Sequence, residues 1–453
     1  MPEKRSQQGD LTHGTVWKVI LRFTFPLLIG NILLQTYNLV DSIIVGQFLG
    51  KEALAAVSAS FFIYYFIISI IIGIGSGITV VISQYYGAKQ YEKVQRSFSS
   101  FFIFMLISGI FLSVIGILFA EAFFRITQTP EDIIPQAVRY FKIYVAGTFL
   151  FITLNSLISI LRGIGDSTRP MYFILITAIL NVLLDLLFVV VFKWDIGGVA
   201  LATVIAQGVG MCIALIYIHQ KHPILSIRKK DMIFDRKLFV QGLKIGLPTS
   251  VQQGSISLGL IALLGIVNGF GTDTLTAYGA AGKIDTLITQ AILTSASALA
   301  AFCGQNIGAM NFDRVRKGIL FCMKMNTLFC LITFVVIYFF GTEIMWIFTS
   351  DENVIAIGYE YLLITGSFFV IHGALNILNG ALRGAGDTLF TMVTSIITFW
   401  LARIPLAYYL SNLWGPSGIW WAINFSIGAG LIATFIYYRT GRWKKRSVIS
   451  KMD

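Results

Sequence analysis

Long apolar runs follow one another along almost the whole chain, separated by short polar stretches. Inside the runs, polar residues recur three or four positions apart, which is the period of an α-helix. Each run holds enough apolar residues to cross a bilayer as a helix, which takes ~20. The pattern therefore predicts an all-α polytopic membrane protein with twelve transmembrane helices. These spans cover residues 17–46, 54–82, 98–119, 136–161, 170–192, 198–219, 242–267, 277–303, 318–340, 355–381, 389–410 and 417–438.

Composition and charge agree with this topology. Of the 453 residues, 56% are hydrophobic and only 12% are charged, against ~25% charged in a soluble domain. Most basic residues fall on one side of the predicted membrane, and most loop acids fall on the other. This matches the positive-inside rule, and an even number of spans places both termini in the cytoplasm. Topology explains the net charge of +12, so we expect no binding to nucleic acid.

The chain also contains an internal repeat. Gln84–Arg96 (QYYGAKQYEKVQR) matches Gln305–Lys317 (QNIGAMNFDRVRK), and Leu161–Thr168 (LRGIGDST) matches Leu382–Thr388 (LRGAGDT) at the same offset of 221. Six spans in each half keep both halves in one orientation, as in parallel-repeat transporters. The repeat predicts an N-terminal six-helix lobe (residues 1–220), a basic cytoplasmic linker (221–240) and a C-terminal six-helix lobe (241–453).

Few ionisable residues lie inside the spans away from the basic ends. They are Asp41, Asp185, Lys283, Asp285 and Arg403, with His372 as a further polar candidate. A charge inside a membrane helix costs ~2.5–3.5 kcal/mol on insertion scales, so such residues usually face a cavity or the interior of a bundle. Asp41 and Asp185 have apolar counterparts in the second half, so the acid pair belongs to the first half alone. For Asp41, a position near the headgroups at the helix end is the alternative.

The acid pair allows two kinds of chemistry. Asn181 lies one turn before Asp185 on the same helix face. Carboxylates, an amide and hydroxyls gathered in a bundle form either a hard-cation site or a site that takes up a proton, because burial and like charge disfavour two ionised carboxylates. The alternative is a hydrogen-bond network that only joins helices, worth ~0.6 kcal/mol per bond. For Lys283 and Arg403 the favoured interpretation is a structural ion pair.

The first span combines a proline with a polar stripe. Asn31, Gln35, Asn38 and Ser42 are spaced by four, three and four, and share one helix face. Tyr37 lies one turn before Asp41, beside that stripe. A proline lacks an N–H and crowds the carbonyl four residues back. We predict that this span is straight, or bent at or just beyond Pro26.

Glycine-rich stretches do not indicate an enzyme. Gly279–Ile284 (GAAGKI) lacks the glycine spacing and the hydroxyl residue of a P-loop, and the sequence contains no HExxH or GxSxG motif. Gly73–Gly77 (GIGSG) lies inside a span and is typical of close helix packing. We therefore expect a protein without enzymatic activity.

At this point the residues resemble a known family. The run TYNLVDSIIVGQFLG in span 1, QxxGAxxxxxV after spans 2 and 8, and LRGxGD after spans 4 and 10 are similar to those of the multidrug and toxic compound extrusion (MATE) family. The resemblance covers essentially the whole chain. It implies a monomeric transporter of the cell membrane, which exports organic cations or drugs in exchange for H⁺ or Na⁺ by rocker-switch alternating access. No cofactor other than the coupling ion is implied.

The resemblance is to the prokaryotic DinF-like branch, whose cation site lies in the N-terminal lobe. It assigns that role to Asp41, Asn181, Asp185 and Thr203, which are also the metal ligands if the ion is Na⁺, with Tyr37 and Asn155 as accessory residues. Pro26 matches the proline at which span 1 bends. The NorM-like branch implies acids in spans 7 and 10. Span 7 offers only Gln252 and Gln253, and span 10 only Glu360 near its outer end and His372, so a C-terminal cation site is not favoured.

Several side chains are candidates for a substrate cavity. They are Asn31, Gln35, Asn38, Gln252, Gln253, Lys283 and Asp285. The runner-up function is a lipid-linked saccharide flippase of the same superfamily, which needs a strongly cationic cavity and finds mainly Lys283 and Arg403 here. An intramembrane enzyme lacks a catalytic set, and a channel does not explain tandem halves with an acid pair in only one of them.

Overall fold

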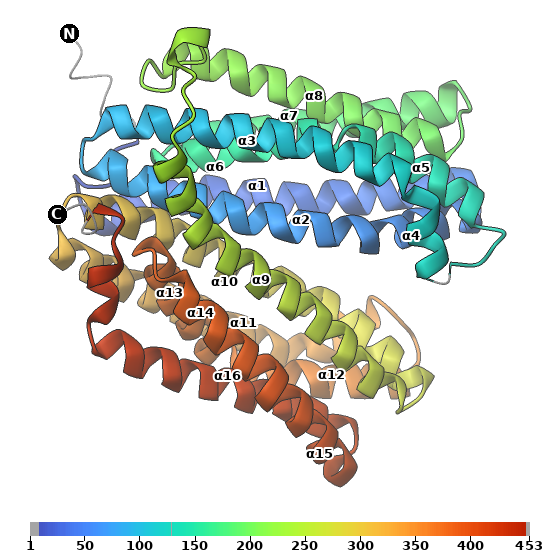
Figure 1. Ribbon diagram of the computed structural model, residues 1–453. Coiled ribbons are helices and arrows are strands. Elements are labelled where there is room, and N and C mark those ends of the chain that lie inside the picture. The colour runs from blue at the N-terminus through green and yellow to red at the C-terminus, as the bar shows by residue number, and fades with distance from the viewer. Residues whose placement is uncertain (1–8, 128, 450–453) are drawn as a thin grey trace. The chain divides into compact units, whose positions relative to one another are not determined.

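The computed structural model describes residues 9–127 and 129–449, so residues 1–8, 128 and 450–453 of the predicted lobes lie outside the described part (Figure 1). The α-helices are α1 (Val16–Ile44), α2 (Gly50–Gly87), α3 (Tyr91–Leu118), α4 (Ala120–Ile126), α5 (Ile134–Ala146), α6 (Thr148–Gly163), α7 (Thr168–Asp185), α8 (Ile196–Lys221), α9 (Arg236–Asn268), α10 (Thr272–Gly308), α11 (Phe312–Trp346), α12 (Glu352–Ser367), α13 (Phe369–Gly384), α14 (Thr388–Ile396), α15 (Ile404–Trp414) and α16 (Pro416–Arg439). The π-helical segments are η1 (Val45–Leu49), η2 (Leu186–Val191) and η4 (Ile397–Arg403), and the 3₁₀ turns are η3 (Lys229–Asp231) and η5 (Arg442–Arg446).

The described residues contain the twelve spans that the sequence predicts. Ten segments are long and apolar enough to cross a membrane, and two more spans are bent helix pairs. These pairs are α5 with α6, at 46°, and α12 with α13, at 50°. At the first bend, Gly147 lies against α8, and a Cβ added there would come within 2.4 Å of Val204 Cγ2. The all-α, multi-pass architecture is confirmed.

The chain divides into two compact units with the same internal packing. In unit 1, α2 and α3 pack against α5 and α6, and α8 packs against α5, α6 and α7. In unit 2, α10 and α11 pack against α12 and α13, and α16 packs against α12, α13 and the helix that runs from α14 to α15. These helices of one unit therefore have the neighbours of their counterparts in the other, as the internal repeat predicts.

Two helices belong to both units. Unit 1 contains Phe25–Gly246, and unit 2 contains Leu11–Thr24 together with the chain from Leu247 onward. The start of α1 thus groups with unit 2, and the start of α9 groups with unit 1. Each boundary falls inside an uninterrupted helix, two residues before Pro26 in α1 and two before Pro248 in α9.

The repeated LRGxGD motif forms the same turn in both units. Gly165 and Gly386 have φ values of +85° and +87°, which a side chain strongly disfavours. The aspartate after each glycine folds back, and its amide donates to the carbonyl of the motif's leucine at 2.9 Å. The carboxylate then accepts a hydrogen bond from a tyrosine of the unit's last helix, Tyr217 for Asp166 and Tyr437 for Asp387. Through this hydrogen bond, the motif joins the fourth and the sixth span of each unit.

Glycines hold the start of α9 against α2. A Cβ built on Gly77 would lie 2.6 Å from the carbonyl oxygen of Gly242 and 2.7 Å from the amide nitrogen of Gly246. A Cβ on Gly242 would meet the ring of Phe101 on α3 at 1.9 Å. These approaches confirm that the GIGSG stretch permits close helix packing, and they attach the start of α9 to unit 1.

We expect Gly77→Ala to destabilise the protein. The new methyl group would meet backbone atoms of α9, which cannot rotate away, so a loss of about 1–3 kcal/mol is expected from overpacking. Thermal unfolding of the purified protein in detergent measures this effect. Gly265→Ala is the matched control, since a Cβ there meets nothing within 4 Å. Equal melting temperatures for the two variants would contradict the tight α2–α9 contact.

Candidate functional site

The two acids of the first half meet inside unit 1. Asp185 ends α7 and is 0% exposed. The carboxyl group of Asp41, on α1, is a direct electrostatic neighbour of the Asp185 carboxyl group. Both oxygens of Asp185, Oδ1 of Asp41 and Oδ1 of Asn181 are buried without a hydrogen-bond donor among the described residues. The chemistry of these four acceptors suits a proton or a cation that prefers oxygen ligands.

Neighbouring polar groups orient these acceptors. The Asn181 amide donates to Thr203 Oγ1 on α8 at 3.1 Å, and the Thr203 hydroxyl donates to the Val199 carbonyl at 3.2 Å. The amide nitrogen of Asn181 is thus engaged, and its oxygen stays without a partner among the described residues. The structure brings together Asp41, Asp185, Asn181 and Thr203, the four residues that the resemblance assigns to cation binding.

Tyrosines form the wall of the site. Tyr37 on α1 is an electrostatic neighbour of both carboxylates, and so is Tyr140 on α5. The rings of Tyr140 and Tyr144 stack with centroids 5.6 Å apart, and Tyr64 on α2 meets Tyr144 edge-on at 4.6 Å. The sequence interpretation named only Tyr37. Tyr140 and Tyr144 are one turn apart in an apolar span, which was the available signal.

Irregular helix turns lie next to the ionisable residues of the spans. In unit 1, η2 begins directly after Asp185, and η1 begins at Val45, one turn beyond Asp41. In unit 2, η4 ends on Arg403. π-Helical turns are rare and frequently occur at functional sites. Their positions indicate that the helices are locally distorted where the ionisable groups lie.

The other predicted residues of unit 1 lie outside this cluster. Asn155 donates to the Phe151 carbonyl of its own helix at 2.9 Å, so its amide nitrogen is engaged within α6. In the polar stripe of α1, Gln35 and Asn38 are exposed on unit 1, and Asn31 is half-buried. Ser42 donates to the Asn38 carbonyl at 2.9 Å. The stripe therefore faces out of its own helix bundle.

In unit 2 the predicted residues differ in burial and in the groups they contact. Gln252 is buried and donates to the Thr391 carbonyl on α14 at 3.2 Å, whereas Gln253 is half-buried. Lys283 is exposed, with its Nζ 5.8 Å from the centre of the Phe348 ring. Gln252 thus joins two helices of the unit.

Asp285 and Arg403 form a second charged region. Asp285 on α10 has Tyr361 and Arg403 as electrostatic neighbours. Arg403 Nε donates to Ser426 Oγ at 2.9 Å, and its guanidinium lies 4.1 Å from the centre of the Phe399 ring. Among the described residues, neither Lys283 nor Arg403 forms the direct ion pair that the sequence interpretation favoured. Arg403 is held by a hydroxyl and an aromatic ring instead.

The remaining candidates of span 10 have local partners. Glu360 accepts a hydrogen bond from Ser417 on α16 at 2.7 Å. His372 lies on α13, where its carbonyl accepts from the Asn376 amide at 2.9 Å. Neither observation brings these two side chains to the acid pair of unit 1.

Comparison with known proteins identifies the class. The MatE family profile matches the chain twice, over residues 26–187 and 248–409. The two matches lie 222 residues apart, which reproduces the internal repeat. The chain belongs to the MATE family of multidrug and toxic compound efflux transporters. Members of this family are transporters and not enzymes, as the sequence predicts.

Relatives of known sequence and structure agree with this assignment. The chain is 31% identical to the probable multidrug resistance protein YpnP of Bacillus subtilis, over 98% of this chain and 99% of that protein. It is 25% identical to an FAD transporter of Shewanella oneidensis, over 90% and 91% of the two chains. A crystal structure of a MATE transporter in a bent conformation superposes with a TM-score of 0.90, at 24% identity and 98% coverage of both chains. At that identity the superposition supports the fold.

We expect Asp185→Asn to make the protein more stable. The amide removes one buried charge and supplies a donor to the unpartnered oxygen of Asp41, and an unsatisfied buried polar group costs about 1–3 kcal/mol. Thermal unfolding in detergent without substrate or Na⁺ measures the gain. An unchanged or lower melting temperature would contradict the unmet need for a donor.

Proposed function

We propose that this protein is a secondary antiporter, which exports organic cations or drugs in exchange for H⁺ or Na⁺ and couples the two movements at Asp41 and Asp185. The observation that supports this proposal best is the set of four buried acceptors without a donor among the described residues of unit 1. Such a set binds a proton or a cation of oxygen-preferring chemistry. An apolar replacement would hold the helices together equally well, so a purely structural role explains these acids poorly.

The coupling follows from charge. An ion that enters from outside neutralises the pair, which changes the arrangement of α1 that is stable and removes the electrostatic attraction for a cationic drug. One charge that moves inward through 100 mV supplies ~2.3 kcal/mol. At about 1.4 kcal/mol per tenfold, that energy sustains a gradient of roughly 50-fold for a neutral drug. Alternating access by rocker-switch movement of the two halves completes the cycle.

The proposed substrate class follows from the charges of the candidate residues in the spans. The candidate residues that the sequence places away from the basic ends of the spans are three acids (Asp41, Asp185 and Asp285) and two bases (Lys283 and Arg403), which favours a cation over an anion. In this proposal the exposed amides of α1 and the Asp285 carboxylate contact the substrate. The protein acts as a monomer in the cell membrane, with both termini in the cytoplasm.

Two measurements test the proposal. Drug susceptibility of a host that lacks its main pumps, with and without this gene, tests efflux itself. Transport by purified protein in vesicles, driven by a sodium gradient and by a proton gradient separately, then identifies the coupling ion. A gain in resistance without dependence on either gradient would overturn the antiport proposal, and flipping of a lipid-linked saccharide would favour the runner-up.

We expect Asp41→Asn to abolish efflux while drug binding survives. The amide cannot exchange a proton or neutralise Na⁺, so the roughly 50-fold gradient that one charge supports is lost. Uptake of drug into inverted vesicles measures this loss, and equilibrium binding to the purified variant provides the second readout. Gln253→Ala is the control on unit 2 and should do less. Normal pumping by Asp41→Asn under either gradient would contradict coupling at Asp41 and would make Asp285 the next candidate.

We expect Pro26→Ala to impair transport while expression stays intact. Alanine restores the hydrogen bond to the Arg22 carbonyl and removes the steric crowding, so the straight helix is favoured over the bent one. MATE structures of the same fold are described in a bent and in a straight conformation, and one carries a P26A substitution. Transport rate divided by the amount of protein in the membrane is the quantity to compare. Wild-type transport would mean that the proline is incidental.

A further inference from the structure

The repeated QxxGAxxxxxV motif has no role in the coupling site, yet it contacts the chain at a specific place. In unit 2 the motif residue Gln305 and two residues at its variable positions, Asn306 and Arg314, surround the segment Leu11–Gly14, just before α1. The Leu11 amide donates to Gln305 Oε1 at 2.9 Å, and the Asn306 amide donates to the Leu11 carbonyl at 3.2 Å. Gln305 and Asn306 are both 0% exposed. The start of α1 is thus bound to unit 2 by buried polar side chains.

Arg314 makes the largest contribution to this attachment. Its Nη1 donates to the Gly14 carbonyl at 2.6 Å, and its Nη2 donates to the His13 carbonyl at 2.7 Å. Nε and Nη2 also approach the Leu11 carbonyl at 3.4 and 3.3 Å. One guanidinium therefore joins three parts of the segment. Lysine has one nitrogen at its end and cannot reproduce this fork.

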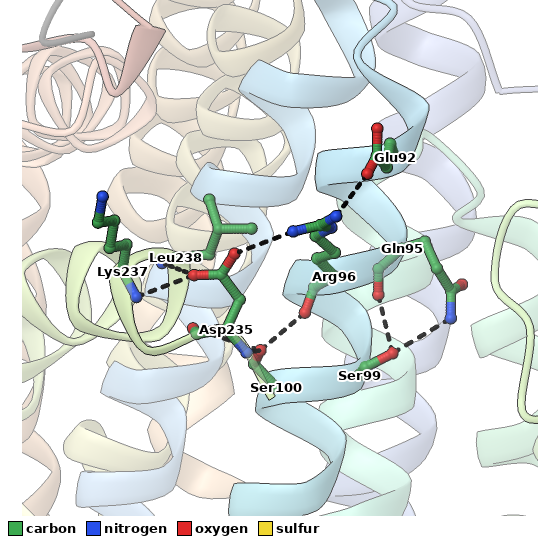
Figure 2. A network of polar contacts seen from close by, with 8 residues as sticks. All are labelled: Glu92, Gln95, Arg96, Ser99, Ser100, Asp235, Lys237 and Leu238. Atoms are coloured by element: carbon green, nitrogen blue, oxygen red, sulfur yellow. Dashed lines mark hydrogen bonds and ion pairs between the residues drawn. The ribbon is translucent and has the colours of Figure 1, made fainter. Parts of the chain in front are cut away.

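The first half attaches the start of α9 in an equivalent way. Tyr85, the counterpart of Asn306, donates to Gln241 Oε1 at 2.8 Å. Figure 2 shows the adjoining contacts of α3, in which Arg96 reaches Asp235 at 3.9 Å and Asp235 caps the first turn of α9. The Asp235 amide also donates to Ser100 at 2.7 Å. Each half therefore holds the first turns of the other half's leading helix.

The two prolines lie just beyond these attachments. α1 is attached to unit 2 up to Thr24 and continues in unit 1 from Phe25, one residue before Pro26. A helix that is fixed at its start to one unit and at its centre to the other must bend between them when the units move. Proline lowers the resistance to bending because it removes one backbone hydrogen bond.

We propose that Arg314 is a positioning residue for ion coupling. It keeps the start of α1 on unit 2 throughout the transport cycle, so that movement of the units is converted into bending of α1 at Pro26 and displacement of Asp41. This inference rests on the proposed role of Asp41. It goes beyond that role in assigning a function to the repeated loop motif, which contacts neither the ion nor the substrate.

The first test compares Arg314→Ala with Arg316→Ala, an exposed arginine on the same helix. Loss of a charge-assisted hydrogen bond is worth about tenfold, so we expect ion-driven drug accumulation to fall about tenfold or more in Arg314→Ala. Drug binding should stay within about twofold, because Arg314 contacts neither ligand. Arg316→Ala should behave as wild type, and Arg314→Lys should fall between the two.

Hydrogen exchange separates positioning from general stability. In Arg314→Ala, amides of residues 15–24 should exchange faster, whereas those of the α9 start, Arg236–Gly246, should not change because unit 1 holds them. Faster exchange at residues 15–24 with normal transport would overturn the proposal. A parallel loss of binding, transport and melting temperature would also overturn it, since a purely structural role predicts that result. If Arg314→Ala fails to fold, Arg314→Lys carries the same comparison.

A chemical cross-link between positions 13 and 314 tests whether the attachment of α1 is sufficient to restore transport. Cysteines introduced by His13→Cys and Arg314→Cys, in a chain whose exposed Cys212 is replaced by serine, are joined with a short bis-maleimide. Because the attachment stays closed in this proposal, cross-linking should restore the transport that Arg314→Cys loses. Transport that remains lost would show that the contact must open, which overturns the proposal. Asp41→Asn in parallel separates the two proposals: if that variant pumps normally the coupling site is wrong, whatever the cross-link does.

Discussion

The proximity of two carboxyl groups in one apolar bundle is the constraint on which the proposed function depends. Asp185 has no exposed surface, and neither of its oxygens has a donor among the described residues. Buried charge without a partner is costly, whereas a bound proton or cation removes that cost. The Asn181 amide nitrogen supplies no donor to the acids, because it donates to Thr203, and the Asn181 oxygen is itself without a partner among the described residues. In the proposed function, this property makes the site respond to the concentration of an ion.

The second unit shows how the same packing can carry a different charge pattern. Its helices have the neighbours of their counterparts in unit 1. In place of two acids it contains Asp285 with Arg403 as an electrostatic neighbour. Aromatic rings of Tyr278, Tyr361 and Trp420 pack around this region, with Tyr278 stacked on Trp420 at 5.5 Å. The acid of unit 2 therefore has a positive charge in its surroundings, whereas no cation is an electrostatic neighbour of Asp41 or Asp185 among the described residues.

Prolines and π-helical turns interrupt the regular backbone of these helix bundles. Unit boundaries cross α1 and α9 near a proline, and π-helical turns follow Asp41 and Asp185. Within a membrane every backbone polar group needs an internal partner, so a helix cannot simply unwind. Local distortions at proline and at π-turns change the direction of a helix while most of its hydrogen bonds persist. In the proposed transport cycle, we therefore expect bending at these few places, close to the ionisable groups.

The number of spans, the tandem repeat and the candidate acids were accessible from sequence. They depend on local periodicity and on the cost of placing charge in lipid, which act residue by residue. The sequence did not predict in the same way which residues contact one another in the folded protein. Tyr140 and Tyr144 join the acid pair only because α5 packs on α2 and α8, and the contact of Arg314 with Leu11–Gly14 joins residues about 300 positions apart. Such contacts are decided by tertiary packing, since no pattern along one helix specifies which side chains another helix will bring to it.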